Sequence, residues 1–395
     1  RHVSGNVLHA AGRAAGGGMM DAQQCADSRG EAVPTQQRTP LFVAAPVFGG
    51  NERKYVLEAL DDGWISSGRF VTRFAAEFGA RFGATCIPVS SGTAALHLAL
   101  AALGIGPGDE VLVPALTFIA TANAVAYCGA TPVVVDVDLV TWCLDVDKAV
   151  AARTPRTKAV VPVDLYGYPV DIAALRAALP GLAIVEDACE AIGAVRAGHP
   201  AGAMAETAVF SFYANKTLTM GEGGAIITHD PALAEHMTLL ARNGQRSRRY
   251  VHEVVGYNYR LTDLQAAIGC AQLERWEWLV DRRRLLALFY QQRLPPDVRM
   301  QDDPADGAHG RWAMAVLLPD GAPSDAIADR LGQEGIETRP FFTPLHHAPM
   351  YQVCAPTPCP VSDDLVARGL VLPLHGQMTE AHVRRVCQTL GEAIA

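Results

Sequence analysis

Short apolar runs rich in β-branched residues alternate with helical patterns from residue 85 onward, and this alternation constrains the fold more than any other feature. Strands separated by helices form βαβ units, which build a mainly parallel sheet covered on both faces. The sequence therefore predicts an α/β fold. The predicted strands are residues 86–89, 110–113, 131–136, 159–162, 183–186 and 225–228, and the predicted helices among them are residues 93–103, 120–127 and 172–179.

The pattern divides the chain of 395 residues into three parts. Because domains usually hold ~100–200 residues, we expect one large domain and a smaller one. We interpret residues 1–38 as a disordered segment or an extension, residues 39–290 as the large domain with an N-terminal arm, and residues 291–395 as a small C-terminal α+β domain. The run Leu294-Pro295-Pro296 marks the boundary. Further predictions are helices at 52–61, 262–288 and 324–334, a strand at 312–318, and a last helix from residue 380.

Charge and hydrophobicity exclude several classes of protein. Half of the residues are hydrophobic and 19% are charged, which excludes a disordered polar chain. The formal net charge of -8 argues against nucleic-acid binding, because such proteins concentrate Lys and Arg. The longest apolar stretches fall short of the ~20 residues that a membrane helix needs, so we expect no membrane span.

The nine cysteines are odd in number and scattered, with neither a CxxC pair nor a metal-ligand spacing. This usage predicts reduced thiols, a cytoplasmic location and no metal site. Residues 1–38 lack the apolar core of a signal peptide, which agrees with that location.

The first segment that carries chemistry is SSGTAAL, residues 90–96, where a predicted strand ends and a helix begins. The N-terminus of a helix offers free N–H groups and the positive end of the helix dipole. Gly92 lets an anion approach the backbone closely, and Thr93 adds a hydroxyl. A Ser/Thr helix cap without any ligand is the simpler alternative, and it explains most sequences of this kind.

The second segment is VEDACE, residues 185–190, where an acid pair closes an apolar strand in the middle of the predicted sheet. A carboxylate at that place, Asp187, could accept a hydrogen bond from a protonated pyridine nitrogen and keep the ring an electron sink. A strand-end cap or a metal-binding aspartate are the alternatives.

The third segment is FSFYANKT, residues 210–217, followed by GEGG at residues 221–224. A lysine within an aromatic, glycine-flanked segment is easily desolvated, which lowers the pKa of its amine and favours imine formation. That lysine is Lys216, although most lysines are surface charges. GEGG could form a simple hairpin turn, and it does not match a P-loop because it lacks the Lys-Ser/Thr ending and precedes a strand.

The three segments follow in the order that a pyridoxal-phosphate fold requires. An anion-binding turn comes first, Asp187 follows about 95 residues after Gly92, and Lys216 follows about 30 residues later. From residue 40 to the C-terminus the chain resembles the sugar-nucleotide aminotransferases of the DegT/DnrJ/EryC1/StrS group, within the aspartate-aminotransferase-like fold. The stretches that carry the resemblance, which is closest to the GDP-perosamine synthases, are SSGTAALHLALAALGIGPGDEVLVP, SFYANKTLTMGEGGAIITHD, GYNYRLTDLQAAIG and IETRPFFTPLHHAPMY.

The resemblance implies a fold type I enzyme with a mainly parallel, seven-stranded-type sheet that binds pyridoxal 5'-phosphate through Lys216 as a Schiff base. Asp187 then contacts the pyridine nitrogen and Glu190 approaches the ring hydroxyl. The remaining implied cofactor contacts are Gly92, Thr93 and Ser211 at the phosphate, Phe118 stacked on the ring, and Asn258, which reaches the phosphate of a partner subunit in a homodimer.

The resemblance also implies substrates. L-glutamate donates the amine, and the acceptor is a nucleotide-linked 4-keto-6-deoxy sugar, best matched by GDP-4-keto-6-deoxy-D-mannose, which gives GDP-perosamine. A dTDP- or UDP-linked 3- or 4-keto sugar is the alternative acceptor, and a non-catalytic, cofactor-binding regulator is the alternative of another class. Arginine binds phosphate bidentately. The candidate substrate contacts are Arg260, Arg339 and His346, for which structural ion pairing or capping is the alternative, with His309 after them.

One segment departs from the family. Where many relatives read VHLYG, residues 163–167 of this chain read VDLYG, so Asp164 replaces a histidine. If that position orients the substrate, the departure bears on which sugar is used and leaves the cofactor chemistry unchanged. The related dehydratases carry histidine in place of the lysine, so Lys216 favours transamination.

Overall fold

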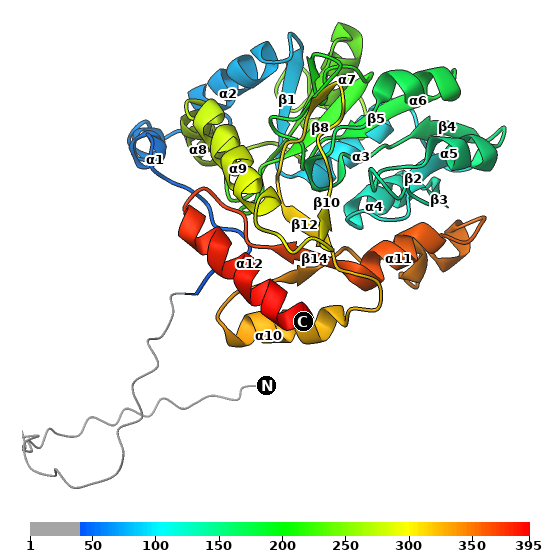
Figure 1. The fold of residues 1–395 in the computed structure, drawn as a ribbon. Coiled ribbons are helices and arrows are strands. Elements are labelled where there is room, and N and C mark those ends of the chain that lie inside the picture. The colour runs from blue at the N-terminus through cyan, green and yellow to red at the C-terminus, as the bar shows by residue number, and fades with distance from the viewer. Residues whose placement is uncertain (1–39) are drawn as a thin grey trace, which may run out of the picture. The chain divides into compact units, whose positions relative to one another are not determined.

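A seven-stranded sheet forms the centre of the computed structural model, which describes residues 40–395 (Figure 1). The described residues form one compact unit, and the expected extension at residues 1–38 lies outside them. The strands of this sheet are β1 (Thr85–Val89), β2 (Glu110–Pro114), β3 (Thr131–Val135), β4 (Thr157–Val160), β5 (Ala183–Asp187), β8 (Thr207–Ser211) and β9 (Gly224–Thr228).

The strand order is β1-β9-β8-β5-β4-β2-β3. β9 pairs antiparallel with both β1 and β8, whereas the neighbours from β8 to β3 pair in parallel. Six strands therefore end at the same edge of the sheet, and β9 alone runs the other way. The prediction of an α/β fold with a mainly parallel seven-stranded sheet is confirmed.

Helices cover both faces because buried side chains alternate along the strands. In β2, Val111 and Val113 pack with α3, α4 and α7, while Leu112 packs on the opposite face with α5 and α6. On that second face, α2, α8 and α9 cover the end of the sheet near β8 and β9. The helices are α2 (Arg69–Ala80), α3 (Gly92–Ala102), α4 (Ala120–Tyr127), α5 (Val146–Ala152), α6 (Ile172–Ala178), α7 (Pro231–Ala241), α8 (Asp263–Leu273) and α9 (Trp276–Gln291).

The helices outside the βαβ units agree with the sequence only in part. The helix predicted at 52–61 is α1 (Glu52–Asp61), but α2 was not predicted. The single helix predicted at 262–288 is wrong, because the chain breaks between α8 and α9. Neither Gly nor Pro marks the break; instead Glu274 pairs with Arg73 of α2 at 2.8 Å and Arg275 with Glu52 of α1 at 3.9 Å.

The C-terminal part surrounds a four-stranded antiparallel sheet in the order β10-β12-β14-β13, and Figure 1 shows α10 and α12 beside it. The segment that precedes α1 joins this part, since the N–H of Leu374 donates to the carbonyl of Val43 at 3.0 Å. The boundary at residues 290/291 remains a prediction. The elements are β10 (Arg299–Met300), β12 (Met314–Leu317), α10 (Ser324–Gln333), β13 (Arg339–Pro340), α11 (Pro360–Arg368), β14 (Gly369–Leu372) and α12 (Glu380–Ile394).

Short elements complete the fold. They are a three-stranded sheet of β11 (Gly307–Ala308), β6 (Val195–Arg196) and β7 (His199–Pro200), and three 3₁₀ turns, η1 (Leu165–Gly167), η2 (Leu345–His347) and η3 (Gln352–Cys354). Across residues 40–395, every helix is too short or too polar to pass through a lipid bilayer.

Phe78 of α2 is the centre of an aromatic cluster on the face covered by α2 and α8. It is fully buried, and its ring lies 5.1 Å from that of Phe210 and 5.4 Å from that of Phe212, measured between centroids. Since Phe212 precedes the segment with Lys216, this packing supports the connection that carries the lysine.

Phe78→Ala should lower the free energy of unfolding by about 3–5 kcal/mol, because it leaves a cavity that the surrounding rings fill only in part. Chemical denaturation measures the change. Leu288→Ala, at a half-exposed position of α9, is the control and should change stability by less than about 0.5 kcal/mol. Equal losses in the two variants would contradict this packing role.

Candidate active site

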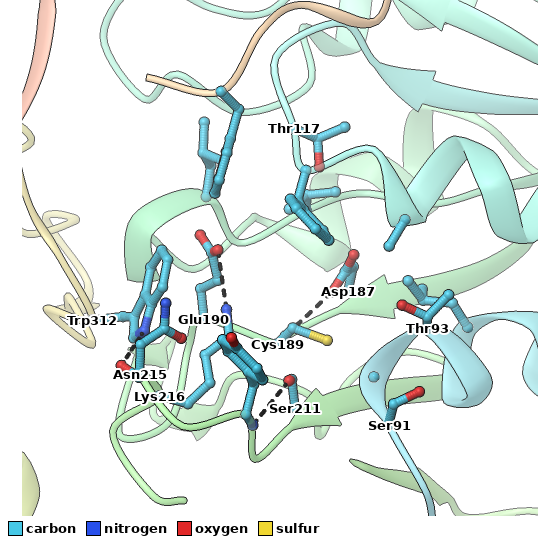
Figure 2. Close-up of a pocket in the computed structure, with 18 of the residues that line it drawn as sticks. Ser91, Thr93, Thr117, Asp187, Cys189, Glu190, Ser211, Asn215, Lys216 and Trp312 are labelled. Carbon is cyan, nitrogen blue, oxygen red and sulfur yellow. Dashed lines mark hydrogen bonds and ion pairs between the residues drawn. The ribbon is translucent and has the colours of Figure 1, made fainter. Parts of the chain in front are cut away.

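The carboxyl ends of β1, β2, β4, β5 and β8 meet around a cavity of about 240 Å³ (Figure 2). Polar groups gather at this edge because parallel strands direct their following loops to the same side. Seven predicted cofactor contacts line the cavity together: Gly92, Thr93, Phe118, Asp187, Glu190, Ser211 and Lys216.

The start of α3 forms one wall of the cavity. Ser91 caps the helix by accepting a hydrogen bond from the N–H of Ala94 at 3.1 Å. The first N–H groups of a helix have no acceptor within it, so those of Gly92 and Thr93 are free for an anion. A Cβ on Gly92 would lie 3.0 Å from Cβ of Ser211, which explains the glycine. This wall fits a phosphate group.

Asp187 is the last residue of β5 and is almost completely buried. Its Oδ2 accepts a hydrogen bond from the hydroxyl of Thr121 in α4 at 2.9 Å, and its Oδ1 accepts one from the N–H of Cys189 at 3.3 Å. Two donors therefore fix the orientation of this carboxylate. A fixed, buried carboxylate is the acceptor that a protonated pyridine nitrogen needs.

Lys216 lies in the connection between β8 and β9 with 12% of its side chain exposed. Its Nζ lies 3.2 Å from Oε1 of Glu190 and 3.8 Å from the ring centroid of Trp312. Burial raises the pKa of Glu190, while the Lys216 ammonium and the N–H of Tyr166, at 2.8 Å, oppose the rise. Figure 2 shows Lys216, Glu190 and Trp312 on one side of the cavity and Thr93 on the other, with Asp187 between them.

Phe118 follows β2 and is 54% exposed, with its ring 5.7 Å from that of Phe342. An exposed aromatic face at the cavity can stack on a flat ring. The cavity thus offers a phosphate wall, a buried carboxylate, a buried amine and an aromatic face. This set fits pyridoxal phosphate, and Lys216 would hold it covalently.

Asn258 and Arg260 both lie outside this cavity. Asn258 is exposed and pairs through its backbone with Arg242. Arg260 lines a separate cavity of about 230 Å³, together with Arg242. Within one chain, neither residue reaches the group of cofactor contacts.

The other three candidate substrate contacts lie in different surroundings. Arg339 lines a neighbouring cavity of about 340 Å³, and its guanidinium donates to Glu337 at 3.3 Å. Nε2 of His346 and Nε2 of His347 each lie 2.9 Å from Oδ1 of Asp363. His346, His347 and Asp363 are close enough together to hold a metal ion, although hydrogen bonds account for their approach.

His309, the last of the candidate substrate contacts, does not line the cavity. Its ring is buried, with Nε2 3.1 Å from Oε1 of Gln301 and Nδ1 accepting from the N–H of Arg311 at 2.9 Å. Burial lowers the pKa of His309 well below its usual value, with Arg311 adding to the effect, so the imidazole is neutral. Both nitrogens are thus occupied by the protein itself.

Sequence reasoning missed Thr121 and Trp312 as parts of the site. Thr121 lies inside a predicted helix, and a helical threonine carries no sign of a distant carboxylate. Trp312 comes from the C-terminal part, and its indole N–H donates to the carbonyl of Asn215 at 3.0 Å. Only packing brings these residues to Asp187 and Lys216.

Thr121→Val removes the hydroxyl that donates to Asp187 while keeping the side-chain shape. We expect the dissociation constant for pyridoxal phosphate to rise about fivefold, which corresponds to the ~1 kcal/mol of one hydrogen bond. Titration of the cofactor-free protein, followed by absorbance, measures the change. Thr121→Ser retains the hydroxyl and should bind as the unmodified chain does; weakening in both variants alike would contradict the role of the hydroxyl.

Comparison with known proteins agrees with this geometry. The DegT/DnrJ/EryC1/StrS aminotransferase family matches residues 47–391. GDP-perosamine synthase of Caulobacter vibrioides is 46% identical over 364 residues, which cover 90% of this chain and 98% of the relative. The UDP-N-acetyl-3-dehydro-α-D-glucosamine 3-aminotransferase of Acidithiobacillus ferrooxidans is 39% identical over 337 residues, covering 84% of this chain and 90% of the relative.

A solved structure supports the same relationship. The aminotransferase TlmJ of Streptoalloteichus hindustanus superposes with a TM-score of 0.85 at 32% identity, covering 90% of this chain and 98% of that one. The predicted fold class, enzyme class and cofactor are confirmed. The chain belongs to the DegT/DnrJ/EryC1/StrS family of pyridoxal-phosphate-dependent aminotransferases.

Proposed function

We propose that this aminotransferase converts GDP-4-keto-6-deoxy-D-mannose to GDP-perosamine, with L-glutamate as the amino donor. The observation that carries the proposal is the 46% identity to the Caulobacter GDP-perosamine synthase over nearly the full length of that enzyme. Lys216, Asp187 and the start of α3 line one cavity of this chain, and this arrangement supports the transamination chemistry.

Each residue has a separate task in the proposed reaction. Pyridoxal phosphate, when bound, supplies an electron sink. Asp187, held by Thr121, accepts the hydrogen bond of the ring nitrogen and stabilises its positive charge. Lys216 Nζ delivers a proton to the sugar carbon that receives the amine, and Glu190, whose Oε1 lies 3.2 Å from Nζ, orients the lysine side chain.

The neighbouring cavity of about 340 Å³ supports binding of the rest of the substrate. It shares Phe118 and Trp312 with the cofactor cavity, so a sugar that enters through it meets Lys216. Arg339 lines its wall with about half of its side chain exposed, and a guanidinium binds a diphosphate bidentately. We therefore propose Arg339 as the contact for the nucleotide diphosphate.

A second acceptor is also supported. The 39% identity to an enzyme that aminates C3 of a UDP-linked sugar favours a UDP- or dTDP-linked 3- or 4-keto sugar as the alternative substrate. The regulator without turnover is set aside, because Lys216, Asp187 and the phosphate wall are all present in one cavity.

We also propose a homodimer whose sites are shared between subunits. Asn258 is exposed and lies outside the cavity of its own chain, as a residue that serves a partner's phosphate would. Arg260 and His346 also lie outside that cavity. They remain proposed substrate contacts, because a residue outside its own chain's cavity can serve the site of the partner subunit. A cytoplasmic location, favoured by the scattered cysteines, remains a prediction.

Lys216→Ala should remove the visible absorbance of the lysine-linked cofactor and lower turnover by about 10²–10⁴-fold or more, because the proton carrier is lost. Lys158→Ala, at an exposed position of β4, is the control and should leave both unchanged. Mass spectrometry of products from GDP-, dTDP- and UDP-linked keto sugars with glutamate identifies the acceptor. Equal inertness toward every sugar would refute the proposed function.

A mixing experiment tests the shared site. Lys216→Ala and Asn258→Ala should each be inactive or strongly weakened alone, whereas mixed and re-equilibrated subunits should recover part of the activity. Recovery is expected because a mixed dimer contains one site with Lys216 from one subunit and Asn258 from the other. Mixing Lys216→Ala with Asp187→Ala is the control, since both of these residues lie in one chain's cavity and give no recovery. Absence of recovery in the first mixture would contradict the shared site.

A further inference from the structure

Asp164 and Glu186 form a buried pair of acids behind the catalytic carboxylate. Asp164 is 0% exposed and Glu186 is 1% exposed. Asp164 follows β4, and Glu186 is the residue before Asp187 in β5, so the pair spans two neighbouring parallel strands. Neither acid lines the cofactor cavity.

Hydrogen bonds satisfy only one oxygen of each acid. Oδ1 of Asp164 accepts from the N–H of Val170 at 2.8 Å, and Oε1 of Glu186 accepts from the N–H of Gly202 at 2.7 Å. Within residues 40–395, Oδ2 of Asp164 and Oε2 of Glu186 are buried without a donor. Two ionised carboxylates cannot serve each other, because both only accept; a single proton between them supplies the missing donor.

The charges around the pair favour that proton. Burial raises the pKa of Asp164 well above its usual value, and the negative charges of Glu186 and Asp187 add to the rise. Burial also raises the pKa of Glu186, against the attraction of Arg176. Arg176 itself pairs with Glu206 at 3.0 Å, and the buried thiol of Cys143, beside Asp164, has a raised pKa and stays neutral.

The pair is connected directly to Asp187. The N–H of Asp164 donates to the carbonyl of Asp187 at 3.1 Å, and the N–H of Asp187 donates to the carbonyl of Pro162 at 2.9 Å. Glu186 points to the opposite face of the strand from Asp187, since successive side chains alternate. Separation of the two acids would therefore displace the backbone that carries the catalytic carboxylate.

We propose that Asp164 and Glu186 share one proton and that this acid pair is a positioning element for Asp187. The pair joins the end of β4 to β5. Its shared proton leaves one negative charge behind Asp187 instead of two. Position 164, which the sequence connected with substrate orientation, then acts instead on Asp187, the carboxylate that faces the cofactor cavity.

The first test measures protons taken up on folding. Above pH ~5 the unfolded chain has released its carboxyl protons, whereas the folded pair retains one, so rising pH favours unfolding. In Asp164→Asn the amide donates to Glu186 without a titratable proton. The free energy of unfolding of the cofactor-saturated protein should therefore fall less steeply with pH in Asp164→Asn than in the unmodified chain. The difference between the two slopes should correspond to about one bound proton.

The same slope in both proteins would overturn the shared proton. Glu186→Gln should reproduce the shallower slope, because its amide can donate to Asp164. Difference infrared spectroscopy gives an independent reading: a protonated carboxyl band at neutral pH should be present in the unmodified chain and absent in Asp164→Asn.

The second test separates positioning from packing. Asp164→Leu removes the donor and should weaken cofactor binding about tenfold, within the range for coupled contacts, while Asp164→Asn should bind normally. Asp164→Leu should also shift the pH midpoint of the cofactor's visible absorbance, which reports the charge at Asp187. If Asp164→Leu lowered stability but left both cofactor binding and that midpoint unchanged, the pair would be structural only and the positioning role would be refuted.

Discussion

The parallel pairing of β5 with β8 is the constraint on which the site depends. In this register Asp187 lies opposite Val209, and the chain then continues through Ser211 into the connection that carries Lys216. A shift by one residue would turn Asp187 toward the opposite face of the sheet, because side chains alternate along a strand. The hydrogen bond from Thr121 and the acid pair behind Asp187 both act to hold this arrangement.

Burial gives the charged groups of the site their specific partners. Lys216 and Glu190 are nearly buried and pair with each other, and the ring of Trp312 covers the amine. Away from solvent such pairs are poorly screened, so a change at one group alters the charge of the other. The cofactor cavity and the acids behind it thus form one connected set of charges around β5.

The short segments of the site could be predicted from sequence because their chemistry is local. The cap at Ser91, the glycine at residue 92 and the lysine between β8 and β9 each depend on residues close in the chain. The break between α8 and α9 could not be predicted in this way, since no Gly or Pro marks it and its residues Glu274 and Arg275 pair with side chains of the distant α2 and α1. The surroundings of His309 could not be predicted either, because its contacts with Gln301 and Arg311 form only in the folded C-terminal part.

The sequence by itself determined the alternating α/β pattern, the order of Gly92, Asp187 and Lys216, and through them the family and its cofactor. Periodicity and short motifs suffice for these features because backbone hydrogen bonding and strand-end placement follow from neighbouring residues. Only the tertiary structure decided that Thr121 orients Asp187, that Trp312 covers Lys216, and that Asp164 faces Glu186. These contacts join residues far apart in the chain, and their geometry is set by how the helices pack on the sheet.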